Sequence, residues 1–426
     1  MVDVAKVRMF GQNIGTFAWD ASYRVARFEY DNDFVGKGIE PSPIMMPVQQ
    51  GRIYSFGSLN WDTFNGLPGM LADSLPDTYG RALFDQWLTL TGRTTSNPVE
   101  SLCFLGQRCM GALEFEPATG PSSDANMKFE IDTLIDVARE ALSKKKDFGV
   151  NLDVDRKAAI AEILRLGTSA GGQRAKAIIA YNKKTGEVRS GQISAPEGFD
   201  YYLIKLDGVT AEAGFKETEN FGRLEYSFSE LVKNCGIDMT ECSLIEENGR
   251  AHFLTKRFDR ENGRKIHMQT LCGMAHYDFR LKNGHSYEQA FNVMRRLRLP
   301  YSQAQEMFRR IVFNVVVRNQ DDHTKNISFL MDSSGHWSLS PAYDMGYAYN
   351  PLGVWTATHQ MSINGKFDNI TRADLLSLAN ANNIKNASEI IDQVCETTAG
   401  WPELAKNCGV PQKMIDSIVP DMLLRI

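Results

Sequence analysis

The chain has 426 residues, of which 43% are hydrophobic and 23% are charged, with a formal net charge of -5 and a pI near 5.9. This length is enough for two or three globular domains with a sizeable core. The acidic balance argues against a protein that coats nucleic acid or an anionic membrane, because both need a basic excess. No apolar run approaches the roughly 20 residues that span a bilayer, and residues 1–12 lack the apolar core of a signal peptide. We therefore expect a cytoplasmic protein with no membrane partner.

The N-terminal part of the chain alternates short apolar runs with turn residues, a pattern typical of β-strands. The segment 7–20, VRMFGQNIGTFAWD, predicts a hairpin that turns at Gln12-Asn13. The segment 42–56, SPIMMPVQQGRIYSF, predicts a second pair of strands. Residues 66–88 carry apolar side chains at helical spacing after Pro and Gly, and they predict a helix.

The middle part of the chain combines a helical pattern at 130–142 with a series of strand patterns. The dipeptide Asn262-Gly263, which favours a tight hairpin turn, separates the last two strands. A further helix is expected between the third and fourth strands, because apolar residues there form one stripe. The stripe consists of Phe221, Leu224, Phe228, Leu231 and Val232. The predicted strands are 175–182, 187–193, 201–206, 251–259 and 264–269.

From about residue 271 the apolar pattern becomes helical. The segment 302–319 places Phe308, Ile311, Val312 and Val315 on one face. Other helical patterns cover 286–299, 371–381 and 387–398. A small sheet lobe followed by a helical lobe leaves a cleft between them, which is a common place for a ligand site.

The polar stretch 116–127 is the best linker candidate in the chain, because it gathers Pro, Gly, Ser and Asp residues. Together with the change from sheet to helix near residue 270, it predicts three domains. We expect these at 1–120, 121–268 and 269–426. The seven cysteines are scattered and form none of the CxxC pairs that suit zinc or redox sites, so we expect them to be reduced and mostly buried.

The stretch RNQDDHTKNISFL, residues 318–330, places two carboxylates, a histidine, a lysine and an asparagine between two apolar runs. It follows a predicted helix and leads into two short strands within 326–340. Its polar residues therefore lie on a loop between rigid elements, where catalytic groups are often found.

The spacing within this loop matches one used for phosphoryl transfer. In protein kinases an aspartate acts as base, an asparagine five residues later binds metal, and an aspartate beyond a short hairpin also binds metal. Here Asp321 precedes Asn326 by five residues, and Asp344 follows the predicted hairpin. A D-x4-N pair also arises where both residues only serve turns. The neighbouring Asp322 is a second candidate for the base.

Lys205, in YYLIKLDG, lies on a predicted strand on the same side as Tyr201 and Leu203. Glu225 falls within the apolar stripe of the following helix, where an unpaired carboxylate is costly, so Lys205 is its natural partner. A strand lysine paired with a helix glutamate positions ATP phosphates in kinases. The alternative is that Glu225 only flanks the stripe and Lys205 extends to water.

The segment GTSAGGQRAKAII is rich in glycine and precedes a strand. It does not match a Walker A loop, because Gln173 stands where the lysine is required. Gly167, Gly171 and Gly172 would nevertheless let backbone N–H groups approach phosphate oxygens closely. A plain flexible turn is the alternative.

Taken together, these motifs resemble the HipA-like serine/threonine kinases, the toxin halves of bacterial toxin-antitoxin pairs. The matching segments are LGTSAGGQRAKAII, YYLIKLDG, ENFGRLEYSFSELVKNCGI, HFLTKRFDR, NQDDHTKNISFL and LSPAYDM. The earlier GLPGMLADSLPDTYG is similar to the N-terminal subdomain of that family. The resemblance implies an α+β, two-lobed protein-kinase-like fold, with a mixed β-sheet N-lobe, an all-α C-lobe and an additional N-terminal α/β subdomain.

The resemblance assigns roles by position. It implies that Asp321 is the catalytic base and that Asn326 and Asp344 bind magnesium. It implies that Lys205, supported by Glu225, binds the ATP phosphates.

Further contacts are implied around the nucleotide. His323 and Lys325 would shape the loop and contact phosphate, although a structural hydrogen-bonding role suits His323 equally well. The other implied ATP contacts are Thr168, Ser169, Ala170, Gly171 and Gly172 in the glycine loop and Lys256, Arg257 and Phe258 in the segment that meets the adenine. The family also implies a self-phosphorylated hydroxyl in the glycine loop, and the sequence does not choose between Thr168 and Ser169.

The function implied is that of an ATP- and Mg-dependent serine/threonine protein kinase, a toxin of a type II toxin-antitoxin system. Its partners would be a protein substrate and a small HipB-like DNA-binding antitoxin, through which it would reach DNA only indirectly. Two alternatives stay open. One is a small-molecule phosphotransferase of the same fold, and the other is a catalytically silent binding or corepressor module.

Overall fold

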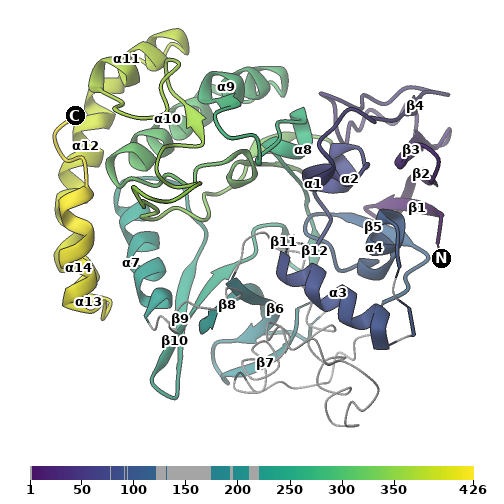
Figure 1. Ribbon diagram of the computed structural model, residues 1–426, viewed down its shortest axis with the longest axis horizontal. Helices are drawn as coiled ribbons and strands as arrows, with labels where there is room; N and C mark the ends of the chain where they lie inside the picture. Colours follow the sequence, from purple (N-terminus) through teal and green to yellow (C-terminus); the bar gives the residue numbers. More distant parts are fainter. Residues whose placement is uncertain are drawn as a thin grey trace. The chain divides into compact units, whose positions relative to one another are not determined.

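The computed structural model describes residues 2–76, 78–90, 92–93, 95–120, 131, 174–191, 195–210 and 220–426 (Figure 1). These residues belong to two compact units. The first unit comprises Met1–Ile39, Val48–Gly222 and Ser243–His267. The second unit comprises Glu40–Pro47, Arg223–Cys242 and Met268–Ile426.

The first unit begins with a five-stranded sheet of order β4-β3-β2-β1-β5. The predicted hairpin is confirmed, but its turn lies at Phe10-Gly11 and not at Gln12-Asn13, which belong to β2. Both turn residues have positive φ, 50° and 76°, and glycine reaches this region without a steric penalty. The strands are β1 (Val4–Met9), β2 (Gln12–Asp20), β3 (Val25–Tyr30), β4 (Ile53–Tyr54) and β5 (Leu113–Glu116).

The expected strand pair within 42–56 is wrong, because only the two-residue strand β4 forms there. Pro43 and Pro47 have no N–H to donate to a sheet, which removes ladder hydrogen bonds from this segment. The helix expected over 66–88 is present but interrupted near Pro76, which cannot continue a helix. The helices here are α1 (Trp61–Phe64), α2 (Gly69–Ala72), α3 (Thr78–Leu90) and α4 (Pro98–Leu105).

A second five-stranded sheet of the first unit has the order β7-β6-β8-β10-β9. Four of its strands confirm the predicted ones, whereas β9 was not predicted. The Asn262-Gly263 turn is also confirmed, with φ of 48° and 76°, and it joins two short strands. The strands of the five-stranded sheet are β6 (Arg174–Asn182), β7 (Glu187–Ser190), β8 (Asp200–Thr210), β9 (Cys242–Glu247) and β10 (Arg250–Lys256). The turn joins β11 (Arg260–Glu261) and β12 (Arg264–Lys265), which form a separate two-stranded sheet.

Helix α7 (Phe221–Asn234) confirms the predicted apolar stripe, since Leu224, Phe228, Leu231 and Val232 are buried. The Phe228 ring stacks on Trp401 with ring centroids 4.7 Å apart. These contacts explain why Leu224, Phe228, Leu231 and Val232 recur at helical spacing, because that spacing places them on the buried face of α7.

Helices make up most of the second unit. The central helix α10 is buried on the face predicted from Phe308, Ile311, Val312 and Val315. The other helices are α8 (Leu271–Ala275), α9 (Tyr287–Arg296), α11 (Arg372–Ala381), α12 (Ala387–Ala399), α13 (Trp401–Asn407) and α14 (Gln412–Ile418), and α10 itself spans Tyr301–Val316. The unit also carries short strands, β13 (His267–Thr270), β14 (His285–Ser286), β15 (Ser328–Met331), β16 (Trp337–Leu339) and β17 (Met361–Ser362).

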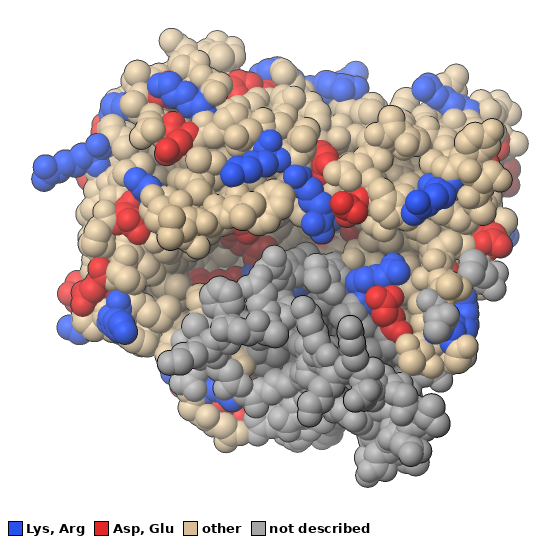
Figure 2. Space-filling view, in the orientation of Figure 1, with Lys and Arg blue, Asp and Glu red and all other residues tan. Residues whose placement is uncertain are grey.

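The cysteines, the apolarity of the helices and the surface charge bear on expectations from the composition. All seven cysteines are free thiols and five are buried, as predicted. Among the described residues, none of the helices is both long enough and apolar enough to cross a membrane. On the face drawn in Figure 2, basic and acidic side chains are interspersed over the described surface, as expected from a small net charge.

Candidate active site

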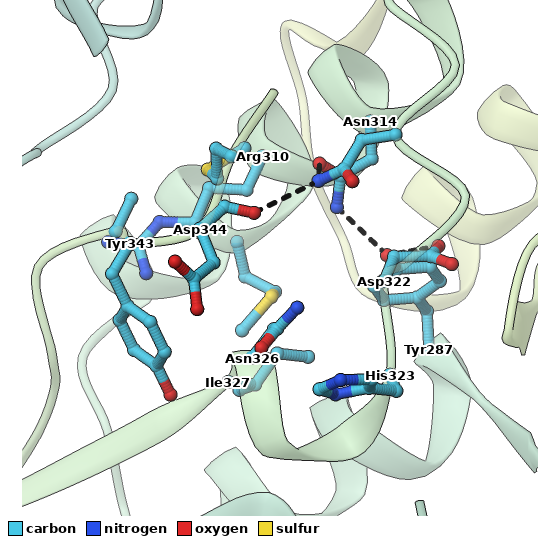
Figure 3. A pocket seen from close by; sticks show the side chains of 13 residues that line it. Tyr287, Arg310, Asn314, Asp322, His323, Asn326, Ile327, Tyr343 and Asp344 are labelled. Atoms are coloured by element: carbon cyan, nitrogen blue, oxygen red, sulfur yellow. Dashed lines mark hydrogen bonds between the residues drawn. The ribbon is translucent and has the colours of Figure 1, made fainter. Parts of the chain in front are cut away.

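A pocket in the second unit opens where α10 ends and the polar loop begins (Figure 3). About 390 Å³ of space, which includes open solvent, lies between its walls. Helices α9 and α10, the loop after α10 and the segment after β16 all contribute to its wall. The lining residues are Tyr287, Met307, Arg310, Asn314, Asn319, Asp322, His323, Asn326, Ile327, Ala342, Tyr343, Asp344 and Met345. The pocket thus brings together His323, Asn326 and Asp344, three of the residues predicted from the sequence.

Asp321 and Asn326 are joined through the backbone of the loop. The side-chain amide of Asn326 donates to the carbonyl of Asp321 at 2.7 Å, closing a short turn that ends in a 3-10 segment, Thr324–Asn326. The Asp321 side chain is 52% exposed and lies 3.9 Å from His323 Nε2. The donating nitrogen of Asn326 is therefore used within the loop, which leaves its amide oxygen as the atom suited to a metal ion.

Asp344 reaches the same pocket from the segment after the β15–β16 hairpin, which forms as predicted. Its backbone has a φ of 50°, a left-handed conformation that non-glycine residues seldom adopt. Such conformations cluster at functional sites, where surrounding contacts hold them. One such contact is the Asn319 amide, which donates to the Asp344 carbonyl at 3.4 Å. Figure 3 shows the Asp344 carboxylate and the Asn326 amide facing the same open space.

Asp322, the second candidate for the base, is buried. Its side chain is 1% exposed and accepts three hydrogen bonds. The donors are the Tyr287 hydroxyl at 2.7 Å, the Gln360 backbone N–H at 2.7 Å and His359 Nδ1 at 2.8 Å. Of the two adjacent aspartates, only Asp321 presents its carboxylate to solvent.

The bonds around Asp322 extend into a buried polar network that the sequence analysis missed. The amide of Asn314 donates to the Tyr287 hydroxyl at 3.0 Å, and the amide of Asn319 donates to Asn314 at 2.9 Å. Burial, followed by the nearby Asp322 carboxylate, raises the pKa of Tyr287 well above its usual value, so the phenol stays protonated and donates. This network connects α9, α10, the loop and Asp344. An asparagine within the apolar pattern of α10 was the available signal, because a buried amide needs partners.

Arg310, also missed, fixes the wall of the pocket opposite the loop. It is buried, and its guanidinium donates to Glu306 at 2.7 Å and to the carbonyl of Ser340 at 2.9 Å. These bonds hold α10 against the segment that follows β16. The segment carrying Asp344 is therefore tied to the same helix as the loop carrying Asp321.

In the first unit, Lys205 occupies the predicted face of β8. Tyr202, Ile204 and Leu206 are buried on the other face, so the alternation is confirmed. The Lys205 ammonium lies 5.7 Å from the centre of the Phe253 ring, across the strand pair.

Lys176 of β6 lies directly opposite Lys205 and was not singled out from the sequence. Directly opposed residues of antiparallel strands share a face, and two like charges there destabilise the sheet unless something offsets them. The available signal was a lysine within the apolar run AKAIIAY.

Two further sets of ATP contacts were predicted, one in the segment that includes Lys256 and Arg257 and one in the glycine loop. Lys256 pairs with Asp200 at 2.9 Å. Arg257 is buried and donates to Asp259 at 2.8 and 2.7 Å, so its guanidinium is engaged within the protein. The glycine-loop candidates Thr168, Ser169, Ala170, Gly171 and Gly172 lie outside the described residues.

Burial of Asp259 by itself raises the pKa of this carboxyl. The charges of Arg257 and Arg260 and the N–H of Gly111 outweigh burial and hold the pKa of Asp259 well below its usual range. The ionised carboxylate of Asp259 therefore links Arg257 and Arg260, which lie at β10 and β11, to the backbone of Gly111.

Comparison with known proteins defines the class of this chain. A model of the HipA-like C-terminal domain matches residues 168–401, more than half of the chain, and a model of the HipA N-terminal domain matches residues 5–116. The chain therefore belongs to the HipA family, as its sequence motifs predicted.

Individual relatives are more distant. A putative kinase of Haemophilus influenzae is 30% identical over 136 residues, which cover 28% of this chain and 39% of the relative. Putative kinase Y4dM of Sinorhizobium fredii is 27% identical over 215 residues, which cover 46% of this chain and 51% of the relative. The chain thus aligns with about half or less of the length of these curated relatives.

A solved structure gives the fold. A chain of the Shewanella oneidensis MR-1 complex of HipA, HipB and operator DNA superposes with a TM-score of 0.68 at 18% identity, over 98% of this chain and 94% of that chain. The expected kinase-like α+β fold is confirmed by this match.

Proposed function

We propose that this protein is an ATP- and magnesium-dependent serine/threonine protein kinase of the HipA type. The observation that carries the proposal is the arrangement of Asp321, Asn326 and Asp344. The Asn326 amide donates to the backbone carbonyl of Asp321 at 2.7 Å, the Asp321 carboxylate is exposed, and Asn326 lines one pocket together with Asp344. Phosphoryl transfer needs a base and metal ligands that face the same point, and these residues supply both.

In the proposed reaction, Asp321 accepts the proton of a serine or threonine hydroxyl while that oxygen bonds to the γ-phosphorus of ATP. The bond from this phosphorus to the bridging β–γ oxygen breaks, and ADP leaves. The contribution of Asp321 is to orient and deprotonate the acceptor. Lys325 and His323 lie on the same loop and are proposed to contact phosphate oxygens.

The residues of the pocket fit magnesium. Magnesium prefers oxygen ligands and is commonly held by one or two carboxylates together with phosphate oxygens and water. Asn326 and Asp344 would supply the protein oxygens. Among the described residues, no group of three or more His, Cys, Asp or Glu gathers to hold a metal by itself, so substrate phosphates would complete the site. When bound, magnesium offsets the charge that develops on the phosphoryl oxygens.

We assign the ATP phosphates to Lys205, supported by the opposed Lys176. Glu225 remains the proposed partner of Lys205, and Lys256 to Phe258 the proposed adenine-facing segment. For Arg257, only the backbone would face the nucleotide, because its guanidinium is bound to Asp259. Thr168 or Ser169 is the proposed site of self-phosphorylation.

The proposed setting is a type II toxin-antitoxin pair in the cytoplasm. The Shewanella relative is part of a HipA, HipB and operator DNA complex. By analogy, this chain would bind a small HipB-like antitoxin and reach DNA only through it. The acidic net charge of -5 supports an indirect contact with DNA, because direct binding favours basic surfaces.

The test is intact-mass analysis of the protein after incubation with magnesium and ATP, combined with measurement of ADP release. We expect the wild type to gain a phosphate and Asp321→Ala to lose activity by about 100- to 10,000-fold, the range for removal of a general base. Asp368→Ala, a change at an exposed carboxylate of the same unit, is the matched control and should behave as wild type. Equal ADP release from Asp321→Ala and wild type would contradict the proposal.

A further inference from the structure

One loop of the second unit displays an unusual amount of apolar surface. Among the described residues, nine large hydrophobic side chains are exposed, and three of them lie within four positions. Leu352 is 93% exposed, Val354 70% and Trp355 43%. Contiguous exposed apolar side chains mark interaction sites more often than isolated ones do. We call residues 350–356 the display loop.

The display loop lies in a segment without charge. From Met345 to Gly365 there is no Asp, Glu, Lys or Arg, whereas 23% of the whole chain is charged. Exposed loops normally carry charged residues, which keep the surface soluble. A partner of this surface would therefore be apolar and uncharged, because a charged segment would lose its water without gaining an ion pair.

The display loop is held in one conformation by its own backbone. The N–H of Asn350 donates to the carbonyl of Thr356 at 3.1 Å, and the N–H of Gly353 donates to the carbonyl of Asn350 at 2.8 Å. The Asn350 side chain also accepts from the N–H of Leu352 at 3.0 Å. The apolar side chains are thus presented on a closed turn, and little loop entropy would be lost when a partner binds.

The display loop is anchored to the candidate active site. The side-chain amide of Gln360 donates to the carbonyl of Trp355. The backbone N–H of the same Gln360 donates to Asp322 at 2.7 Å, and Asp322 is the neighbour of Asp321. One residue therefore connects the display loop to the loop that carries the proposed base.

We propose that the display loop is the docking surface for the protein substrate, and that it binds an uncharged, apolar segment next to the acceptor serine or threonine. The inference rests on the proposed kinase function and names its substrate class. The anchor through Gln360 favours a substrate over other occupants, because it joins the display loop to Asp322, the sequence neighbour of the residue that would receive the acceptor hydroxyl. A second copy of the chain is the competing occupant.

The test uses fluorescein-labelled peptides with a central serine or threonine, flanked either by Leu and Phe or by Lys and Glu. Binding is measured by fluorescence anisotropy and phosphoryl transfer by mass. The variant is Leu352→Ser combined with Val354→Thr, which alters exposed side chains and should fold normally. Ile53→Thr on β4, where the side chain is 57% exposed, is the matched control.

We expect the wild type and Ile53→Thr to prefer the apolar peptides. The double variant should bind them about tenfold or more weakly, the effect of losing burial of aliphatic side chains. This loss should appear in KM for the peptide and not in KM for ATP. Equal peptide affinity in variant and wild type would overturn the proposal. A change in oligomeric state with unchanged peptide affinity would overturn it in favour of self-association.

Failure of the kinase proposal has a different signature. If the peptides bind in a way that depends on Leu352 and Val354 but no phosphate is transferred, the docking surface stands and the kinase function falls. If phosphate is transferred in a manner that depends on Asp321 and the double variant is unaffected, the kinase function stands and the docking surface falls.

Discussion

The neighbouring residues Asp321 and Asp322 allow stability and activity to be separated by single substitutions. Both change to asparagine with almost no change in size. Asp321 is half-exposed on the loop, whereas Asp322 is buried and accepts three hydrogen bonds. We predict that Asp321→Asn folds as the wild type does but loses phosphoryl transfer, and that Asp322→Asn is destabilised.

The size of the effect at Asp322 follows from its partners. Hydrogen bonds to a charged acceptor contribute about 1.5–3 kcal/mol each, and a buried donor left unsatisfied adds to the loss. Asparagine presents an N–H group where Tyr287, His359 and Gln360 all donate, so at least one contact becomes donor against donor. We expect a loss of about 3–5 kcal/mol, the range for breaking a buried charged network. At Asp321 the cost should stay within about 0.5 kcal/mol, as at other exposed sites.

The assay is thermal unfolding of both variants beside the wild type, followed by circular dichroism at pH 7. For a unit of this size, 1 kcal/mol corresponds to about 2–4 °C in Tm, so Asp322→Asn should melt about 6–20 °C lower. Phosphoryl transfer is measured on the same samples at a temperature where both are folded. If the two variants melted together, or if Asp321→Asn kept full activity, the division of roles between these carboxylates would be refuted.

Three further predictions rest on other groups. Tyr287→Phe removes the hydroxyl that bridges Asn314 and Asp322 and should cost about 1–3 kcal/mol in urea unfolding; an unchanged midpoint would argue against the network. The pKa of Asp259 is held below its ordinary 3.8 in the folded state, so its contribution to stability is full above that pH and disappears as the pH falls further. Asp259→Asn should therefore lower Tm at pH 7 and flatten its decline below pH 4, and melts that stay parallel to wild type would speak against this. Burial raises the pKa of Cys109 to about 11, so iodoacetamide at pH 8 should modify the less buried Cys395 first, as followed by peptide mass spectrometry; faster labelling of Cys109 would contradict its burial.

The elements predicted best from the sequence are those encoded over a few neighbouring residues. The Asn262-Gly263 turn depends on two residues that tolerate positive φ, and the alternation around Lys205 depends on the two-residue period of a strand. The apolar face of α10 depends in the same way on the helical period. The shift of the first hairpin turn to Phe10-Gly11 shows the limit of such patterns, because two adjacent dipeptides could both turn and the pairing of the strands selected one.

The candidate site was predicted in part for the same reason. The five-residue spacing of Asp321 and Asn326 lies within one loop, and the sequence alone defined it. That Asp344 would face the same pocket could be expected only by analogy with kinases and required the fold for its geometry.

What the sequence by itself determined about this protein was many of its strands and helices, the Asn262-Gly263 turn and the residues of the polar loop. Only the tertiary structure decided which of two adjacent aspartates is exposed. The partners that bury Asp322, Tyr287 and His359, lie 35 and 37 residues away along the chain. Such contacts leave no periodic signal in the sequence, because they form only when separate helices and loops pack together and each buried polar group has to find a partner.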